Sequence, residues 1–262
     1  MINKCRATRL ALALGCFGIA IPPEARAHFQ ELIPSTDVVD EQTGKTVTLD
    51  IVFTHPFERG PTMAMARPLH FGVLANGKKQ DLAASLQEQP VDGKTAYRAR
   101  YEVSAPADYV FFIEPAAYWE PAEKKMIVHY TKVVVDGFGA EEGWDALVGL
   151  PVEIEPLARP YGVWTGNVFR GVVRQNGKPV PYAEIEVEWK NDGSVSAPAA
   201  AFVTQVIKAD GQGVFAYAMP RAGWWGFAAL VLDEATKMKA PTGELVPVER
   251  GGLMWVRAVD MQ

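Results

Sequence analysis

The chain has 262 residues, of which 48% are hydrophobic, so it is long and apolar enough for one or two domains with buried cores. Its formal net charge is −5 and no basic cluster occurs along it. Because an acidic surface repels phosphate backbones, nucleic acid is excluded as an expected partner.

The first 27 residues have the three parts of a cleavable secretory signal. Basic residues give a positive start, residues 10–21 form an apolar run, and Ala-Arg-Ala at residues 25–27 provides the small-residue exit. The run is too short to span a bilayer, which requires roughly 20 residues. We therefore expect a protein that is exported to the periplasm and begins at His28.

Both cysteines, Cys5 and Cys16, lie inside this signal. A second pattern, Leu14-Gly15-Cys16, resembles a lipoprotein cleavage site, although Leu14 is larger than the residue such sites usually have. Cleavage after residue 27 leaves a chain without thiols, with 22 Lys and Arg against 30 Asp and Glu. Such a chain has no disulfides, and it excludes thiolate metal sites and cysteine nucleophiles.

The part of the chain up to residue 158 is predicted to form an antiparallel β-sandwich. Segments with the alternation or apolar character of strands occur at residues 47–54, 69–74, 97–103, 109–113, 126–135 and 152–154. Turn signals such as Asn76-Gly77 and Asp92-Gly93 separate them, at a spacing typical of a sandwich. Residues 80–89 and 141–148 are each predicted to form a short helix.

A connector at residues 155–162, with two prolines and a glycine, separates a second half from the first. Residues 169–173, the turn Asn176-Gly177 and the alternating residues 183–189 predict a β-hairpin with one solvent-facing side. Further strands are predicted at residues 202–207, 214–219, 224–232 and 253–259.

The second half contains a G-x-V…G-K-P-V opening at residues 171–180 and an Asp-Gly-x-Gly-x-Phe turn at residues 210–215. These features resemble the small prealbumin-like or carboxypeptidase-regulatory sandwich. We therefore predict an all-β protein with two Ig-like or prealbumin-like β-sandwich domains. They are a metal-binding domain at residues 28–158 and a C-terminal domain at residues 159–262.

Histidines are the candidate metal ligands, because cleavage would make His28 the new N-terminus. Its freed α-amine and its ring Nδ1 can then chelate one metal ion together. Apolar residues take the odd positions of residues 47–55, so His55 is predicted to face the core at the end of that strand. His129 shares its face with Ile127 and is also predicted to point inward, whereas His70 is predicted at the surface.

Carboxylates and thioethers near these histidines are further candidates. Glu58 and Glu120 could ligate a metal or hold a ligand imidazole, and both could equally be solvated loop carboxylates. Met63 and Met65 would attract Cu(I), or they fill a loop or core. Three or four nitrogen donors without thiolate suit Ni(II), Cu(II) or Zn(II).

Several separated motifs of the chain resemble those of one protein family. They are the start His28-Phe29 with Ile33-Pro34-Ser35, His55-Pro56-Phe57-Glu58 with Met63, Met65 and Pro68, the block from Tyr118 to Lys132, and Arg159-Pro160-Tyr161-Gly162 with Trp164, Gly166, Asn167 and Phe169. Together they resemble the periplasmic nickel-uptake proteins of the NikK type, which accompany energy-coupling-factor nickel or cobalt transporters.

The resemblance implies a periplasmic Ni(II)-binding protein that delivers nickel to a membrane importer and catalyses no reaction. The positions that match the family are His28, His55 and His129, and Glu58 and Glu120 also lie within its motifs. Ni(II) is the expected metal, with Co(II), Cu(II) or Zn(II) as alternatives.

Two other functions stay open at the level of the sequence. A copper-binding periplasmic protein, or a copper monooxygenase of the lytic polysaccharide type, would also begin with histidine and use a second histidine on a β-sandwich. Against the monooxygenase, the exported chain lacks disulfides. The third reading is a structural or adhesive sandwich in which the position of His28 is accidental.

Overall fold

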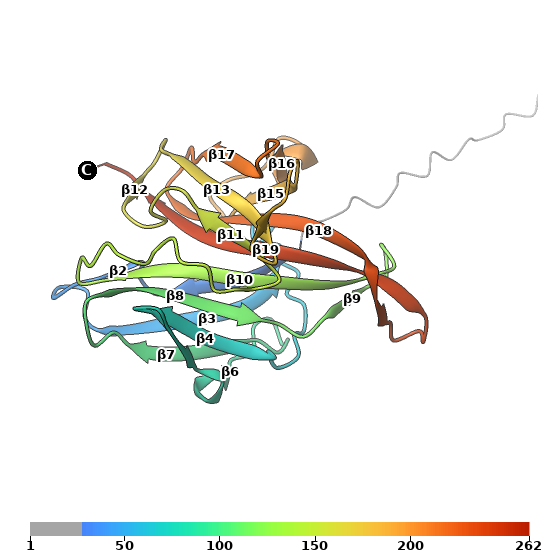
Figure 1. Ribbon diagram of the computed structural model, residues 1–262, viewed down its shortest axis with the longest axis horizontal. Helices are drawn as coiled ribbons and strands as arrows, with labels where there is room; N and C mark the ends of the chain where they lie inside the picture. Colours follow the sequence, from blue (N-terminus) through green and yellow to red (C-terminus); the bar gives the residue numbers. More distant parts are fainter. Residues whose placement is uncertain (1–27, 262) are drawn as a thin grey trace, which may run out of the picture.

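The structure is a computed structural model that describes residues 28–261. The predicted secretory signal, residues 1–27, lies outside the described residues. Within residues 28–261 the only helices are two single 3-10 turns, Ala83–Ser85 and Ala200–Phe202, and everything else that is regular is strand (Figure 1). None of these helices could cross a membrane. The predicted all-β class is confirmed.

A small antiparallel sheet forms one layer of the first sandwich. Its strand order is β1-β3-β7-β6, and its strands are β1 (Phe29–Pro34), β3 (Thr46–Thr54), β7 (Tyr97–Glu102) and β6 (Gln87–Glu88). Buried and less buried residues alternate strictly along most of β3. This is the period of two that the sequence predicted for a half-buried strand.

A large sheet runs through the whole molecule and contributes to both sandwiches (Figure 1). Its order is β16 (Gln205–Lys208), β15 (Glu184–Trp189), β18 (Gly223–Lys239), β19 (Leu245–Val259), β10 (Lys125–Gly137), β8 (Ala107–Glu114), β4 (His70–Ala75) and β5 (Lys78–Asp81). The short strands β2 (Val38–Val39) and β9 (Tyr118–Glu120) pair with β10, and β12 (Val163–Trp164) pairs with β19. At its centre β10 and β19, from opposite halves of the sequence, pair in parallel.

A third sheet covers the other face of the large sheet. It contains β11 (Val152–Pro156), β13 (Val168–Gln175), β14 (Lys178–Pro179) and β17 (Val214–Ala218). Alternate side chains of β19 point to opposite faces, so Trp255 packs into the first core and Met254 into the second. The predicted β-sandwich fold is confirmed. The predicted domain limit at residue 158 stays a prediction. β11, which precedes this residue, pairs with β13, which follows it.

The two helices predicted from the sequence are wrong. Residues 80–89 form only the single turn Ala83–Ser85 between two short strands, because Asp81 Oδ1 accepts a local bond from Ala83 N in place of a helical one. Residues 141–148 form an irregular loop with one short turn, since Glu141 and Gly143 adopt positive φ values of 57° and 101°, which an α-helix excludes.

The predicted hairpin between residues 169–173 and 183–189 is also wrong. Asn176 and Gly177 do form the expected turn, with positive φ values of 49° and 76°. The strand that follows the turn is only the two-residue β14, because prolines at residues 179 and 181 provide no ladder donors. The chain then crosses to the large sheet, where β15 pairs with β16 and β18.

Candidate functional site

Histidines from two neighbouring strands meet at the start of the first described strand. β1 and β3 are antiparallel and in register at Phe29 and Thr54, which brings His28 beside His55. Their ring centroids are 4.7 Å apart. His55 is buried, with an exposed fraction of 4%, as its strand position predicted.

A carboxylate lies beside the His28 ring. Glu120 ends β9, which pairs with β10 and turns back at the edge of the large sheet. Its Oε2 lies 3.2 Å from Nε2 of His28, and its Oε1 accepts a hydrogen bond of 2.9 Å from the backbone N–H of Ala122. Glu120 is buried, so of the two readings of this residue the solvated loop carboxylate is not the one observed.

The third predicted ligand, His129, lies beside this group and is buried as predicted. The Phe53 ring contacts both sides, with centroids 5.7 Å from His28 and 6.1 Å from His129. The backbone of His28 also lies against the His129 ring. Nevertheless, neither ring nitrogen of His129 makes a hydrogen bond within the described residues.

Burial lowers the pKa of His129 to about 3, with further lowering from the nearby His28 and Lys125. The imidazole is therefore neutral across the physiological pH range and keeps a lone pair. A buried polar ring without a partner costs free energy. A ligand that bonded to a ring nitrogen of His129 would remove this cost.

Glu58 lies on the other side of His55, in an acidic cavity of about 390 Å³. Glu184, Glu186 and Glu188 line the same cavity, because alternate residues of β15 point to one face. These three residues were not predicted from the sequence as part of a site. Their alternation was visible, but it predicted only a solvent-facing side of a hairpin.

Burial raises the pKa of Glu188 to about 8 and that of Glu186 to about 7. Glu188 also accepts hydrogen bonds from the backbone N–H of Phe57 and from the Thr204 hydroxyl. Crowded carboxylates with raised pKa values favour the arrival of a positive charge, either a proton or a metal cation.

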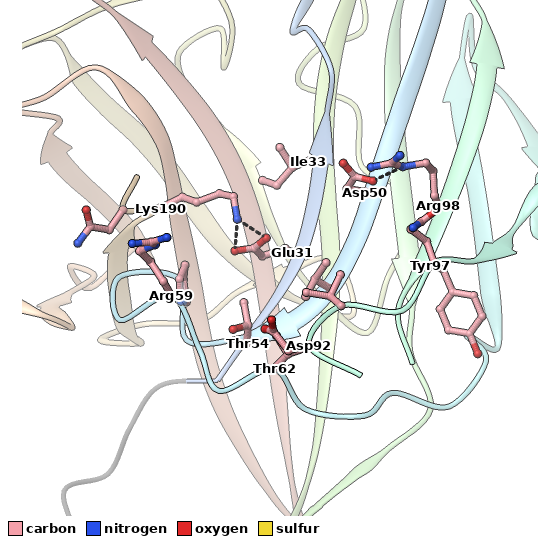
Figure 2. A pocket seen from close by; sticks show the side chains of 15 residues that line it. Glu31, Ile33, Asp50, Thr54, Arg59, Thr62, Asp92, Tyr97, Arg98 and Lys190 are labelled. Carbon is pink, nitrogen blue, oxygen red and sulfur yellow. Dashed lines mark hydrogen bonds and ion pairs between the residues drawn. The ribbon is translucent and has the colours of Figure 1, made fainter. Parts of the chain in front are cut away.

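A further cavity, of about 340 Å³, lies beside β1 and β3 and is shown in Figure 2. Its charged side chains are largely paired with one another. Lys190 Nζ lies 2.8 and 2.6 Å from the two carboxylate oxygens of Glu31, and Arg98 Nε lies 2.6 Å from Asp50 Oδ1 (Figure 2). The Lys190 pair holds β1, whose start carries His28, and the Arg98 pair joins β7 to β3.

The described residues do not form a complete ligand cluster. Among residues 28–261 no group of three or more His, Cys, Asp or Glu side chains is arranged to hold a metal ion. The α-amine of His28, which the predicted site requires, is part of a peptide bond here. The structure thus brings together His28, His55 and Glu120, with His129 and Glu58 on either side, while exposed His70 contributes nothing to the group.

Fold and site together define an all-β protein with buried histidines and carboxylates clustered at one end of a sandwich. A family profile described as "Domain of unknown function (DUF4198)" matches residues 25–233. The chain belongs to this family. No curated protein matches the sequence.

Several solved structures are similar to the chain at low level. A two fibronectin type III domain segment from chicken tenascin is 12% identical, covers 88% of this chain and 100% of its own, and has a TM-score of 0.24. The D00-D0 domain of Intimin is 10% identical, with coverage of 89% and 100% and a TM-score of 0.21. A marsupial T cell receptor is 12% identical, with coverage of 85% and 95% and a TM-score of 0.20. At these scores the likeness supports no argument about this chain.

Proposed function

We propose that this chain is a periplasmic Ni(II)-binding protein that captures nickel and hands it to a membrane importer, without catalysing a reaction. One observation carries the proposal: the His28 ring lies 3.2 Å from a Glu120 oxygen and 4.7 Å, between centroids, from the His55 ring. Nitrogen donors with a carboxylate and no thiolate suit Ni(II), and also Co(II), Cu(II) or Zn(II).

The proposal assigns a role to each residue. His28 contributes its ring and, after cleavage, its α-amine, and His55 contributes a second imidazole. Glu120 either completes the ligand set or holds the His28 ring as an acceptor. His129 contributes a third imidazole next to them. Glu58 belongs to the acidic cavity that draws a hydrated cation toward His55.

The resemblance of the chain to nickel-uptake proteins of the NikK type supports the same function. It rests on motifs that include His28, His55, Glu58, Glu120 and His129. Membership in the DUF4198 family is compatible with this function and does not specify it.

A single added residue tests the chelate. The protein is purified after export, and Ni(II) affinity is measured by competition with a chromophoric chelator at pH 7.5. A variant that carries one glycine before His28 is expected to bind Ni(II) at least about tenfold more weakly, or about 1.4 kcal/mol, because the amine no longer belongs to His28. Affinity of the unmodified protein is expected to fall as pH falls through about 6.5, where imidazoles protonate.

Exposed His70 provides the matched control, and His70→Ala is expected to keep the full affinity. If the added glycine left Ni(II) affinity unchanged while His55→Ala abolished it, the chelating N-terminus would be wrong. If none of the variants changed the affinity, the proposed site itself would be wrong.

A further inference from the structure

An apolar groove of about 190 Å³ lies next to the acidic cavity that contains His55, and the two hollows share Val203. Phe202 is 55% exposed at this groove, which leaves a large apolar side chain in water. The groove is smaller than the roughly 300 Å³ at which small-molecule pockets begin, so it suits one side chain of a partner better than a whole small molecule. Aromatic and aliphatic side chains form most of its wall, among them Phe57, Trp189, Val195, Phe202, Val203 and Trp225.

Strands at the margin of the large sheet support both hollows. β15 contributes Glu188 to the acidic cavity and Trp189, at its end, to the groove. β16 is the last strand of the large sheet on this side, and its Val206 is 53% exposed on the acidic cavity. Within residues 28–261 no strand follows β16 in this sheet, so apolar side chains stay exposed along the margin.

The segment from His55 to Phe57 contributes to both hollows. His55 lines the acidic cavity, and Phe57 lines the groove. Two hydrogen bonds hold the segment against the second sandwich: the backbone N–H of Asn191 donates to the Pro56 carbonyl over 3.2 Å, and that of Phe57 donates to the Glu188 carboxylate over 3.1 Å. A side chain in the groove would therefore lie against a residue two positions from the proposed ligand His55.

The charges around the groove restrict which partner fits. No Lys or Arg is among the residues that line the acidic cavity, all of which are described, whereas four glutamates are: Glu58, Glu184, Glu186 and Glu188. The one charged residue of the groove, Arg221, is stacked over Trp189 at 5.0 Å and donates to the Ser194 hydroxyl. Carboxylates favour a partner with Lys or Arg and repel anionic lipid headgroups. A second copy of this chain, with its net charge of −5, is repelled as well.

We propose that the groove and the acidic cavity together dock a segment of the membrane importer in which an aromatic or aliphatic side chain stands next to Lys or Arg. The apolar side chain enters the groove against Phe57 and Trp225, where its burial stabilises the complex. The basic side chain pairs with Glu184 or Glu186 in the acidic cavity. The inference rests on the proposed function, and it places the importer beside His55, where the metal is handed over.

Site-specific photocrosslinking identifies the occupant. In cells of the native bacterium, Phe202 is replaced by the photoreactive p-benzoylphenylalanine, the exported protein is irradiated, and crosslinked peptides are identified by mass spectrometry. We expect a peptide from an extracytoplasmic segment of the importer that contains Lys or Arg next to an aromatic or aliphatic residue. The control carries the same amino acid at Leu245, which is 71% exposed but lines neither hollow, and it is expected to give no such crosslink.

Affinity for the importer is measured with phosphatidylcholine proteoliposomes that contain it, against empty liposomes. Phe202→Ser is expected to bind the importer at least about tenfold more weakly, because the apolar contact is lost, while its Ni(II) affinity is unchanged. Glu184→Lys is expected to lose importer affinity at low salt, where it repels the basic side chain, and the loss should shrink as salt increases. Leu245→Ser is the matched control and should keep full affinity.

Crosslinks from residue 202 to lipid alone would show a membrane contact, and crosslinks to a second copy of this chain alone would show self-association. Either result would overturn the proposal. So would the absence of any crosslink, or importer affinities of Phe202→Ser or Glu184→Lys equal to that of Leu245→Ser. The crosslink does not require bound metal, so failure of the unmodified protein to bind Ni(II) would count against the nickel function alone.

Discussion

Two buried aspartates face each other across β8 and β10, and burying their carboxylates costs free energy of folding. Asp108 and Asp136 are directly opposite in register, and each has one carboxylate oxygen without a hydrogen-bond partner among the described residues. Tyr161 donates to Asp108 over 2.9 Å, and the backbone N–H of Gly139 donates to Asp136. Burial is the largest cause that raises the pKa of Asp108 to about 6, and the charge of Asp136 adds to it.

The raised pKa predicts how stability depends on pH. The folded protein holds the Asp108 proton more tightly than the unfolded chain does, with a pKa of about 6 against 3.8. The free energy of unfolding should therefore be higher below about pH 4 and decrease, on account of this residue, as pH rises through 6. We expect Asp108→Asn to increase it by about 1–3 kcal/mol at pH 8 and to change it little at pH 4.5.

Urea unfolding at the two pH values measures this difference. Exposed Asp145→Asn is the control and should have no pH-dependent effect of this size. A stabilisation by Asp108→Asn that is the same at both pH values would show that charge is not its cause.

At the scale of elements, β1 determines where His28 lies. The strand pairs with β3 along its length, and residue 31 in its middle is tied to the second half of the sequence through Lys190. Burial raises the pKa of Glu31, and Lys190 opposes that increase. The charge of Lys190 thus stabilises β1, and it reaches this strand only through the tertiary structure.

Removing that charge should loosen the strand. We expect Lys190→Met to reduce the free energy of unfolding by about 1–3 kcal/mol, because the buried Glu31 carboxylate loses its partner. The double variant Glu31→Gln/Lys190→Met should regain part of the loss, since its buried amide carries no charge. Chemical denaturation measures all three proteins.

Lys178→Met, on the exposed strand β14, controls for the loss of a lysine elsewhere. If Lys190→Met were no less stable than Lys178→Met, the ion pair would not hold β1. Ni(II) affinity of Lys190→Met is expected to fall as well, because β1 carries His28 into the site.

At the scale of the whole molecule, the large sheet joins the two sandwiches. β10 and β19 pair in parallel over eight residue pairs, from Met126 with Val248 to Val133 with Trp255. Both cores take side chains from these central strands. One sandwich cannot lose its packing without removing strands from the other.

We therefore expect the protein to unfold in a single transition. Far-UV circular dichroism and tryptophan fluorescence should give the same urea midpoint, because the large sheet contributes side chains to both cores. Two separated midpoints would contradict this expectation and would favour independent domains divided near residue 158.

Local patterns in the sequence determined most of the strands, the inward direction of His55 and His129 and the turn at Asn176-Gly177. A period of two or a turn residue acts over a few neighbours, so no distant contact is needed to interpret it. Only the tertiary structure decided that β10 pairs with β19, that β13 and β15 lie in different sheets, and that three glutamates face His55. The burial that leaves His129 without a partner was likewise decided there, because pairing and desolvation depend on residues far apart in the chain.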